Sequence, residues 1–225
     1  MIKDRLSEIR ERIETAKNGD NREVTLIAVT KTHSPEMINE AIDAGVTDIG
    51  ENKVQEILDK YDKVKPVRWH LIGHLQSNKV KYIIDKVCLI HSVDSKKLMD
   101  EIERQAEKHG ITMEILIQTN ITGEETKFGV KPEEVENLLR HAGSLKHVKV
   151  VGLMTILSKL DNEVANRLHF NNIFNMFIDI SAKKYDNVYM KYLSMGMSGD
   201  FELAVLCGSN MVRVGSAIFG NREYK

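Results

Sequence analysis

Short apolar segments recur along the whole chain and alternate with segments of helical periodicity. Eight runs have the length and apolar character of buried strands, at 24–30, 47–51, 67–73, 87–94, 114–121, 148–156, 191–196 and 211–219. Between them, helical spacing or composition occurs at 35–45, 51–61, 76–86, 95–110 and 132–143. Apolar strands that are separated by helices are typical of a parallel sheet covered on both faces.

The first segment differs from the rest because its apolar residues are spaced by four, three and four positions in a charged background. They are Ile2, Leu6, Ile9 and Ile13. This pattern predicts an amphipathic helix within residues 1–19 that packs on the remainder of the molecule. Residues 158–191 are long and polar for one connection between strands, and we interpret them as a loop followed by a long helix.

Eight strand–helix units predict an α/β protein, a single (β/α)8 TIM-type barrel with an extra N-terminal helix, which forms one domain over 1–225. An open doubly wound sheet is the alternative. That sheet would need a glycine-rich fingerprint after the first strand to bind a dinucleotide, whereas this chain has Lys31-Thr32-His33-Ser34 there.

Charge and cysteine content narrow the class of partner. The chain has 32 Lys and Arg against 33 Asp and Glu, which gives a net charge of -1 and no field to hold nucleic acid or an anionic membrane. We therefore expect a small-molecule partner. Cys88 and Cys207 both lie in apolar stretches, so we expect buried thiols in a reducing compartment. With no membrane-length apolar segment, secretory leader or strongly apolar surface stretch, we expect a cytoplasmic monomer.

Lys31 is the first candidate for chemistry because it follows the first predicted strand. In a barrel of this type the functional residues lie at the carboxyl ends of the strands. A desolvated lysine keeps a larger neutral fraction, the form that attacks an aldehyde carbonyl. The alternative is a strand-end lysine whose stem covers the barrel rim while its ammonium group stays in water.

The last two predicted strands end in glycine and serine, in LSMGMSGD (193–200) and VRVGSAIFG (212–220). A phosphate can be bound at this end of a barrel by backbone N–H groups and by the hydroxyls of Ser198 and Ser216. Gly215, between the strand and Ser216, leaves room for such contacts. Tight turns with helix caps are the alternative. Arg213 lies within the last strand and needs a partner, either inside the barrel mouth or on the covering helices. These are the features of a site for pyridoxal 5'-phosphate (PLP): a lysine for its aldehyde, hydroxyl and amide donors for its phosphate, and a donor for its ring nitrogen.

With these motifs in place, the sequence closely resembles the pyridoxal phosphate homeostasis proteins, single-domain barrels similar in fold to the N-terminal domain of alanine racemase. The resemblance rests on AVTKTHS, DIGENKVQE, WHLIGHLQSNK, HSVDS, TNITGEETKFGV, GLMTI, YLSMGMSGDFELA and GSNMVRVGSAIFG, in that order along nearly the whole chain. It implies that Lys31 forms the Schiff base with PLP and that Arg213 faces the pyridine nitrogen. It also implies that Asn52 lies beside the ring and that the phosphate is held by Ser198, Gly215 and Ser216.

The resemblance implies a protein that binds PLP for intracellular PLP homeostasis, without substantial catalytic activity, and it makes PLP-dependent apoenzymes candidate partners. A PLP-dependent amino-acid racemase or related enzyme is the alternative. Alanine racemases add a second domain that supplies a tyrosine, and this sequence continues only to Lys225, so we expect no racemisation. A cofactor-free lysine aldolase acting on sugar phosphates is a third hypothesis, which the absence of visible colour would identify.

Other features receive no functional role. His70 and His74 are four residues apart, but a strand carries the first and Gly73 follows, so we expect no metal site. Gln76 can be part of a helix start or a rim contact, and Lys127 can be a loop lysine or an anion contact near the site. The chain departs from the family pattern over 157–170 and 204–209, which affects the rim and any partner surface.

Overall fold

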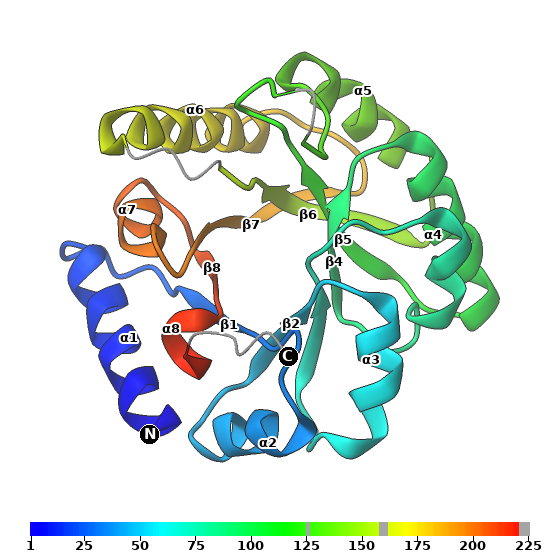
Figure 1. Cartoon of the computed structure of the whole chain (residues 1–225). Helices are drawn as coiled ribbons and strands as arrows, with labels where there is room; N and C mark the ends of the chain where they lie inside the picture. The colour runs from blue at the N-terminus through cyan, green and yellow to red at the C-terminus, as the bar shows by residue number, and fades with distance from the viewer. Residues whose placement is uncertain (125–126, 158–161, 221–225) are drawn as a thin grey trace.

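A closed parallel barrel of eight strands forms the centre of the computed structural model, which describes residues 1–124, 127–157 and 162–220. Neighbouring strands pair in sequence order and the ring closes where β1 pairs with β8 (Figure 1). The strands are β1 (Thr25–Val29), β2 (Asp48–Glu51), β3 (Arg68–Leu71), β4 (Leu89–Val93), β5 (Met113–Gln118), β6 (Val148–Met154), β7 (Val188–Met197) and β8 (Met211–Val214). The predicted TIM-type barrel is confirmed, and each predicted strand overlaps one of these.

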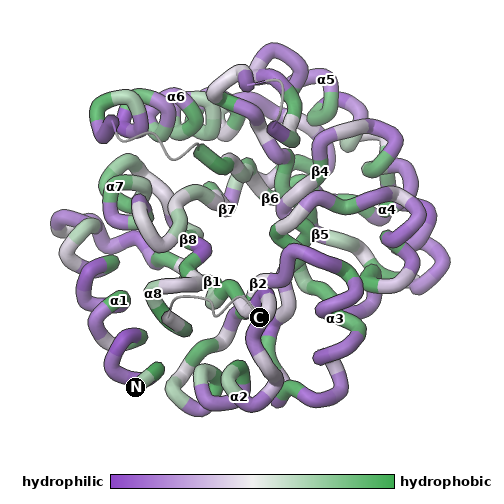
Figure 2. The backbone as a smooth tube through the Cα atoms, viewed as in Figure 1, coloured by the Kyte–Doolittle hydropathy of each residue, from purple (hydrophilic) through white to green (hydrophobic). Residues whose placement is uncertain are grey.

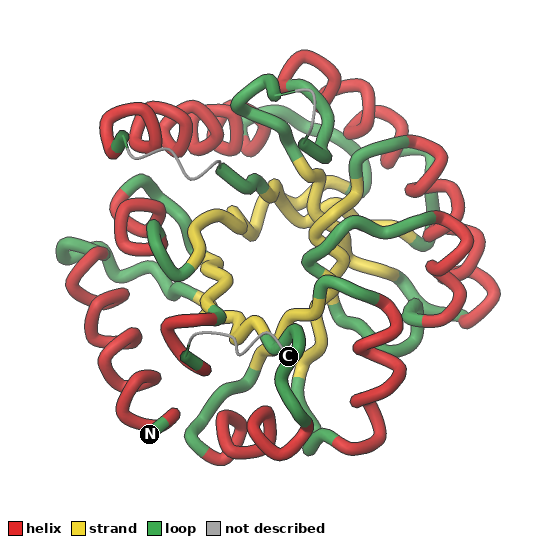
Figure 3. The backbone as a smooth tube through the Cα atoms, in the orientation of Figure 1, coloured by secondary structure: helices red, strands yellow, loops and turns green. Residues whose placement is uncertain are grey.

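Helices surround the barrel (Figure 3). They are α1 (Ile2–Ala16), α2 (Pro35–Asp43), α3 (Val54–Lys60), α4 (Lys96–His109), α5 (Pro132–Ala142), α6 (Glu163–Ser181), α7 (Phe201–Leu206) and α8 (Ser216–Phe219), with 3₁₀ helices η1 (Tyr61–Lys63) and η2 (Ser77–Tyr82). The extra helix α1 buries its four apolar residues and packs mainly against α7 and α8. In the parts of the chain that the structure describes, no helix is long and apolar enough to cross a membrane.

Two apolar clusters lie on the two sides of the barrel wall. The interior cluster consists of Ile27, Leu89, Leu116, Val151, Met154 and Met211. A larger cluster, which includes Ala28 and Ile49, fills the space between the strands and the helices. Figure 2 shows apolar positions along β1, β5 and β6 and many hydrophilic positions on α4. Ile27 and Ala28 thus face opposite sides of the strand, as the two-residue period of a strand requires.

Two expectations need correction. The sequence predicts a helix at 76–86, whereas the structure has only the 3₁₀ helix η2 there. The buried Val80 and Ile83 are three residues apart, which matches the period of a 3₁₀ helix. Cys207 is buried as expected, whereas Cys88 is exposed because it precedes β4 at the open amino end of the barrel.

The long connection before β7 contains α6, as predicted, while 158–161 of the expected loop lie outside the described residues. The helix exposes Val164, Leu168 and Ile178. The monomeric state stays a prediction.

Candidate functional site

Each of the six candidate residues lies in a strand or shortly after one, and four strands are involved. Lys31 comes after β1 and Asn52 directly after β2. Ser198 follows β7, Gly215 follows β8, and Ser216 begins α8. Because the strands are parallel, these positions share the carboxyl end of the barrel, where the loops after the strands meet.

The hydroxyl of Ser198 links the ends of β7 and β8. Its Oγ accepts hydrogen bonds from the backbone N–H of Gly215 at 3.1 Å and of Ala217 at 3.4 Å. A Cβ on Gly215 would lie 3.3 Å from the Cβ of Val29, so glycine permits a close approach of this turn to β1. The N-cap residues of α7 and α8 make no side-chain cap bond, and the hydroxyl of Ser198 reaches these amides from the neighbouring loop. The arrangement gathers two amides and two hydroxyl residues that suit an anion.

Asn52 and Lys31 occupy the adjoining part of the rim. A Cβ on Gly73 would lie 2.3 Å from the Asn52 carbonyl oxygen, so glycine is required where the turn after β3 meets the backbone of Asn52. Lys31 is half-buried. The barrel thus brings a primary amine and an amide side chain to the same end as the Ser198 hydroxyl.

Arg213 lies inside the barrel, which settles the orientation that the sequence left open. It is 3% exposed, and its guanidinium donates to the Ser194 Oγ at 2.5 Å and to the Thr155 carbonyl oxygen at 2.8 Å. Burial lowers the pKa of Arg213 to about 10, although the negative charge of Asp200 opposes that shift. The outward orientation, with an acid on a covering helix as partner, is wrong.

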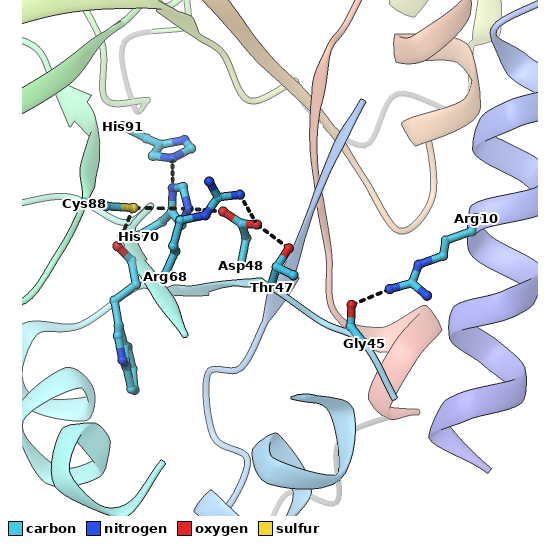
Figure 4. A network of polar contacts seen from close by, with 9 residues as sticks. Arg10, Gly45, Thr47, Asp48, Arg68, His70, Cys88 and His91 are labelled. Carbon is cyan, nitrogen blue, oxygen red and sulfur yellow. Dashed lines mark hydrogen bonds and ion pairs between the residues drawn. The ribbon is translucent and has the colours of Figure 1, made fainter. Parts of the chain in front are cut away.

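A chain of buried polar side chains continues from Arg213 across the barrel interior. Ser194 Oγ lies 3.0 Å from Nδ1 of His91, and His91 Nε2 lies 3.0 Å from Nδ1 of His70. His70 Nε2 then lies 2.9 Å from a carboxylate oxygen of Asp48. We call these five residues, Arg213, Ser194, His91, His70 and Asp48, the interior chain. Figure 4 shows its part from His91 to Asp48, with Arg68 bonded to the second carboxylate oxygen at 2.7 Å.

The two ends of the interior chain fix two of its donors. Arginine has no acceptor, so Arg213 donates to Ser194, and a carboxylate has no donor, so His70 donates from Nε2 to Asp48. Burial, together with the charges of His70 and Arg213, lowers the pKa of His91 well below its usual value.

Asp48 forms the charged end of the interior chain. Burial by itself would raise its pKa, but hydrogen bonds from His70, Arg68 and Thr47 outweigh burial and lower the pKa from 3.8 to about 2. The interior chain therefore has a cation, Arg213, towards the carboxyl end of the barrel and an anion, Asp48, at the amino end. No role was predicted for His91, Ser194 or Asp48, although a polar residue in an apolar strand is the signal that could have identified each.

The remaining candidates do not join this site. His74 is exposed and stacks on Phe128 at 4.0 Å, while His70 belongs to the interior chain, so the two histidines do not converge. Gln76 is exposed where η2 begins. Lys127 pairs with Glu124 at 3.0 Å.

Comparison with known proteins agrees with this architecture. The family model of the alanine racemase N-terminal domain matches residues 5–223. The pyridoxal phosphate homeostasis protein of Aquifex aeolicus is 44% identical over 227 residues, which cover 98% of each chain. This chain belongs to the pyridoxal phosphate homeostasis protein family. The Haemophilus influenzae member of that family is 37% identical over 99% of this chain and 97% of its own.

A solved structure supports the same assignment. PipY of Synechococcus elongatus PCC7942, whose structure has PLP bound, is 31% identical, with a TM-score of 0.86 over 98% of this chain and 100% of PipY. The resemblance to the pyridoxal phosphate homeostasis family that the motifs indicated is thereby confirmed.

Proposed function

We propose that this protein binds PLP at the carboxyl end of its barrel and serves intracellular PLP homeostasis, without substantial catalytic activity. The observation that carries the proposal is the convergence of the Ser198 hydroxyl and the amides of Gly215 and Ala217 at the end of the barrel that also carries Lys31. Membership of the pyridoxal phosphate homeostasis family and the PLP-bound structure of PipY support it.

The chemistry of the residues fits this cofactor. Hydroxyl and amide donors at Ser198, Gly215 and Ser216 suit a phosphate, Asn52 lies on the rim where the ring would rest, and Arg213 is a buried donor for the pyridine nitrogen. The amine of Lys31 condenses with the aldehyde of the cofactor to form a Schiff base and release one water molecule. When bound, PLP supplies a reactive aldehyde and an electron-withdrawing ring.

Arg213 favours storage over catalysis. A guanidinium donates its hydrogen bond without giving up its proton, so it leaves the pyridine nitrogen unprotonated and makes the ring a poorer sink for electrons. Two acceptors hold this cation in place, the Ser194 Oγ and the Thr155 carbonyl oxygen. The match to the alanine racemase N-terminal domain keeps a PLP-dependent racemase or related enzyme as the second candidate.

The same proposal includes a cytoplasmic monomer that supplies PLP-dependent apoenzymes. The two free cysteines support that location. Sedimentation of the PLP-loaded protein with and without a PLP-free enzyme tests both the monomer and the partner.

A spectrum of the purified protein with PLP, before and after borohydride reduction, tests the site. We expect a visible band that reduction removes, and peptide mapping should then find the reduced cofactor on Lys31. Label on Lys53 or Lys79 instead would contradict the assignment, and a colourless protein would favour a cofactor-free aldolase. Rapid racemisation or transamination by the wild type would overturn the storage function.

A further inference from the structure

The motif GENKVQE (50–56) contains two acidic residues that the proposed function leaves unused. Glu51 ends β2 with a fully buried side chain, and Glu56 lies in α3. The ammonium group of Lys60, at the end of α3, lies 2.7 Å from a carboxylate oxygen of Glu51 and 2.8 Å from one of Glu56. We call Glu51, Glu56 and Lys60 the Lys60 cluster.

The Lys60 cluster contacts the backbone on both sides of Lys31. Lys60 Nζ donates to the carbonyl oxygen of Thr30 at 3.0 Å, and the backbone N–H of Thr32 donates to Glu56 Oε2 at 2.6 Å. These two groups belong to the two peptide units that flank the Cα of Lys31. Both units are therefore anchored, one through its oxygen and one through its nitrogen.

The conformation of Thr32 explains why such anchoring matters. Its φ is 67°, in the left-handed region that β-branched residues rarely adopt. Such a backbone persists only where the surroundings hold it. The bond from the Thr32 N–H to the Glu56 carboxylate is charge-assisted and therefore stronger than a bond between neutral groups.

The three donors of Lys60 have three acceptors within 3.0 Å, the Thr30 carbonyl oxygen and the carboxylates of Glu51 and Glu56. An ammonium group has three N–H donors, so Lys60 is fully used as a protonated structural lysine. Partial burial raises the pKa of Glu56, but hydrogen bonds from Lys60 and the Thr32 N–H outweigh it and lower that pKa below its usual value. Glu56 therefore stays an anion and a strong acceptor.

We propose that Glu51, Glu56 and Lys60 are positioning residues that fix the backbone on both sides of Lys31 and so aim its amine at the aldehyde of the cofactor. The inference rests on the proposed function, since it concerns the lysine assigned there. Glu51 supports the arrangement from the side of the strand, because its carboxylate accepts both from Lys60 and, at 2.7 Å, from the Thr30 hydroxyl.

Glu56→Ala is the most direct test, with Asp59→Ala as its matched control. Alanine at 56 removes the acceptor of the Thr32 N–H and leaves Lys60 paired with Glu51, so the fold should persist, which circular dichroism checks. Asp59 is an exposed residue of the same helix that pairs with Gln55 at the same four-residue spacing, at 2.8 Å. Its loss should leave the Lys31 loop unchanged.

Two measurements are made on each protein. In the cofactor-free protein, the Thr32 amide should exchange with deuterium about tenfold or more faster in Glu56→Ala than in the wild type. Titration with PLP, followed by absorbance, should give about tenfold weaker binding, with borohydride label still on Lys31. Glu56→Gln keeps an acceptor without the charge, so its exchange rate and affinity should fall between those of alanine and the wild type.

Wild-type affinity in Glu56→Ala would overturn the positioning role, whether or not Thr32 exchanges faster. An equal loss of affinity in Asp59→Ala would also overturn it, because damage to α3 would then explain the effect. A wild type that takes no label on Lys31 would overturn the proposed function and this inference together. A labelled wild type beside an unaffected Glu56→Ala variant would overturn the inference alone.

Discussion

The Lys60 cluster and the interior chain are both buried and polar, yet they are built in opposite ways. The Lys60 cluster gathers three ionisable side chains around one ammonium group, between the barrel wall and α3. The interior chain places hydroxyl and imidazole groups between a cation and an anion, and its members come from β2, β3, β4, β7 and β8. Concentrated charge fixes one short loop firmly, whereas hydroxyl and imidazole links extend a line of hydrogen bonds across the barrel.

This difference has a consequence for stability. Removing one partner of a compact buried ion cluster leaves an uncompensated charge away from water, which is costly. Removing a single group from the interior chain leaves an unpaired hydrogen-bonding group, which costs less than an unpaired buried charge. Substitutions in the two networks should therefore have effects of different size.

The largest effect is expected for Lys60→Met. The substitution leaves Glu51 and Glu56 near each other without their shared cation, so the free energy of unfolding should fall by about 3–5 kcal/mol. Urea denaturation at neutral pH measures it. Lys63→Met, at an exposed position three residues later, is the control and should change stability by less than about 0.5 kcal/mol. Equal stability of the two variants would show that the Lys60 cluster is not a tight ion cluster.

Much of this architecture could be predicted from the sequence because it follows from local patterns. All eight strands overlapped an apolar run, since strands covered on both faces read as continuous apolar segments. The position of Lys31, Ser198 and Gly215 at the carboxyl end of the barrel could be predicted because each follows an apolar strand. The resemblance added Asn52, which no local pattern distinguished.

The two polar networks could not be predicted in the same way. His91 and Ser194 are 103 positions apart and lie on strands that do not pair with each other, so only closure of the barrel brings them together. Glu51 and Glu56 appear in a recognised motif, but their common partner Lys60 lies outside it. The 3₁₀ geometry of η2 could not be predicted either, because composition alone does not distinguish a 3₁₀ helix from an α-helix.

A middle-sized effect is expected for Asp48→Asn. The native pKa of Asp48, about 2, is below its ordinary value of 3.8, so the ionised form adds stability above pH 4 that disappears as the pH falls towards 2. At pH 7 the variant should lose about 2 kcal/mol, because each pKa unit corresponds to about 1.4 kcal/mol. Denaturation curves of both proteins at several pH values should converge near pH 2.

Asp43→Asn provides the comparison for that experiment. Asp43 pairs with Lys65 at 2.5 Å, but both side chains are half exposed or more. Its variant should follow the wild type within about 1 kcal/mol at every pH. A constant difference between Asp48→Asn and the wild type from pH 7 to pH 2 would mean that the charge of Asp48 is not what stabilises the interior chain.

The smallest effect is expected for Arg68→Ala, because Arg68 only contacts the interior chain at its Asp48 end. Arg68 donates to Asp48 at 2.7 Å, but its side chain is 62% exposed, so water replaces the guanidinium when it is removed. The loss should be less than about 1 kcal/mol and should shrink as salt is added. Asp48 keeps its bonds from His70 and Thr47, at 2.9 and 2.7 Å, so its pKa should rise without returning to the ordinary value. A double-mutant cycle with Asp48→Asn isolates the pair. A coupling energy as large as the full effect of Asp48→Asn would contradict the place of Asp48 in the interior chain, because Asp48 would then depend on Arg68 rather than on the imidazole of His70.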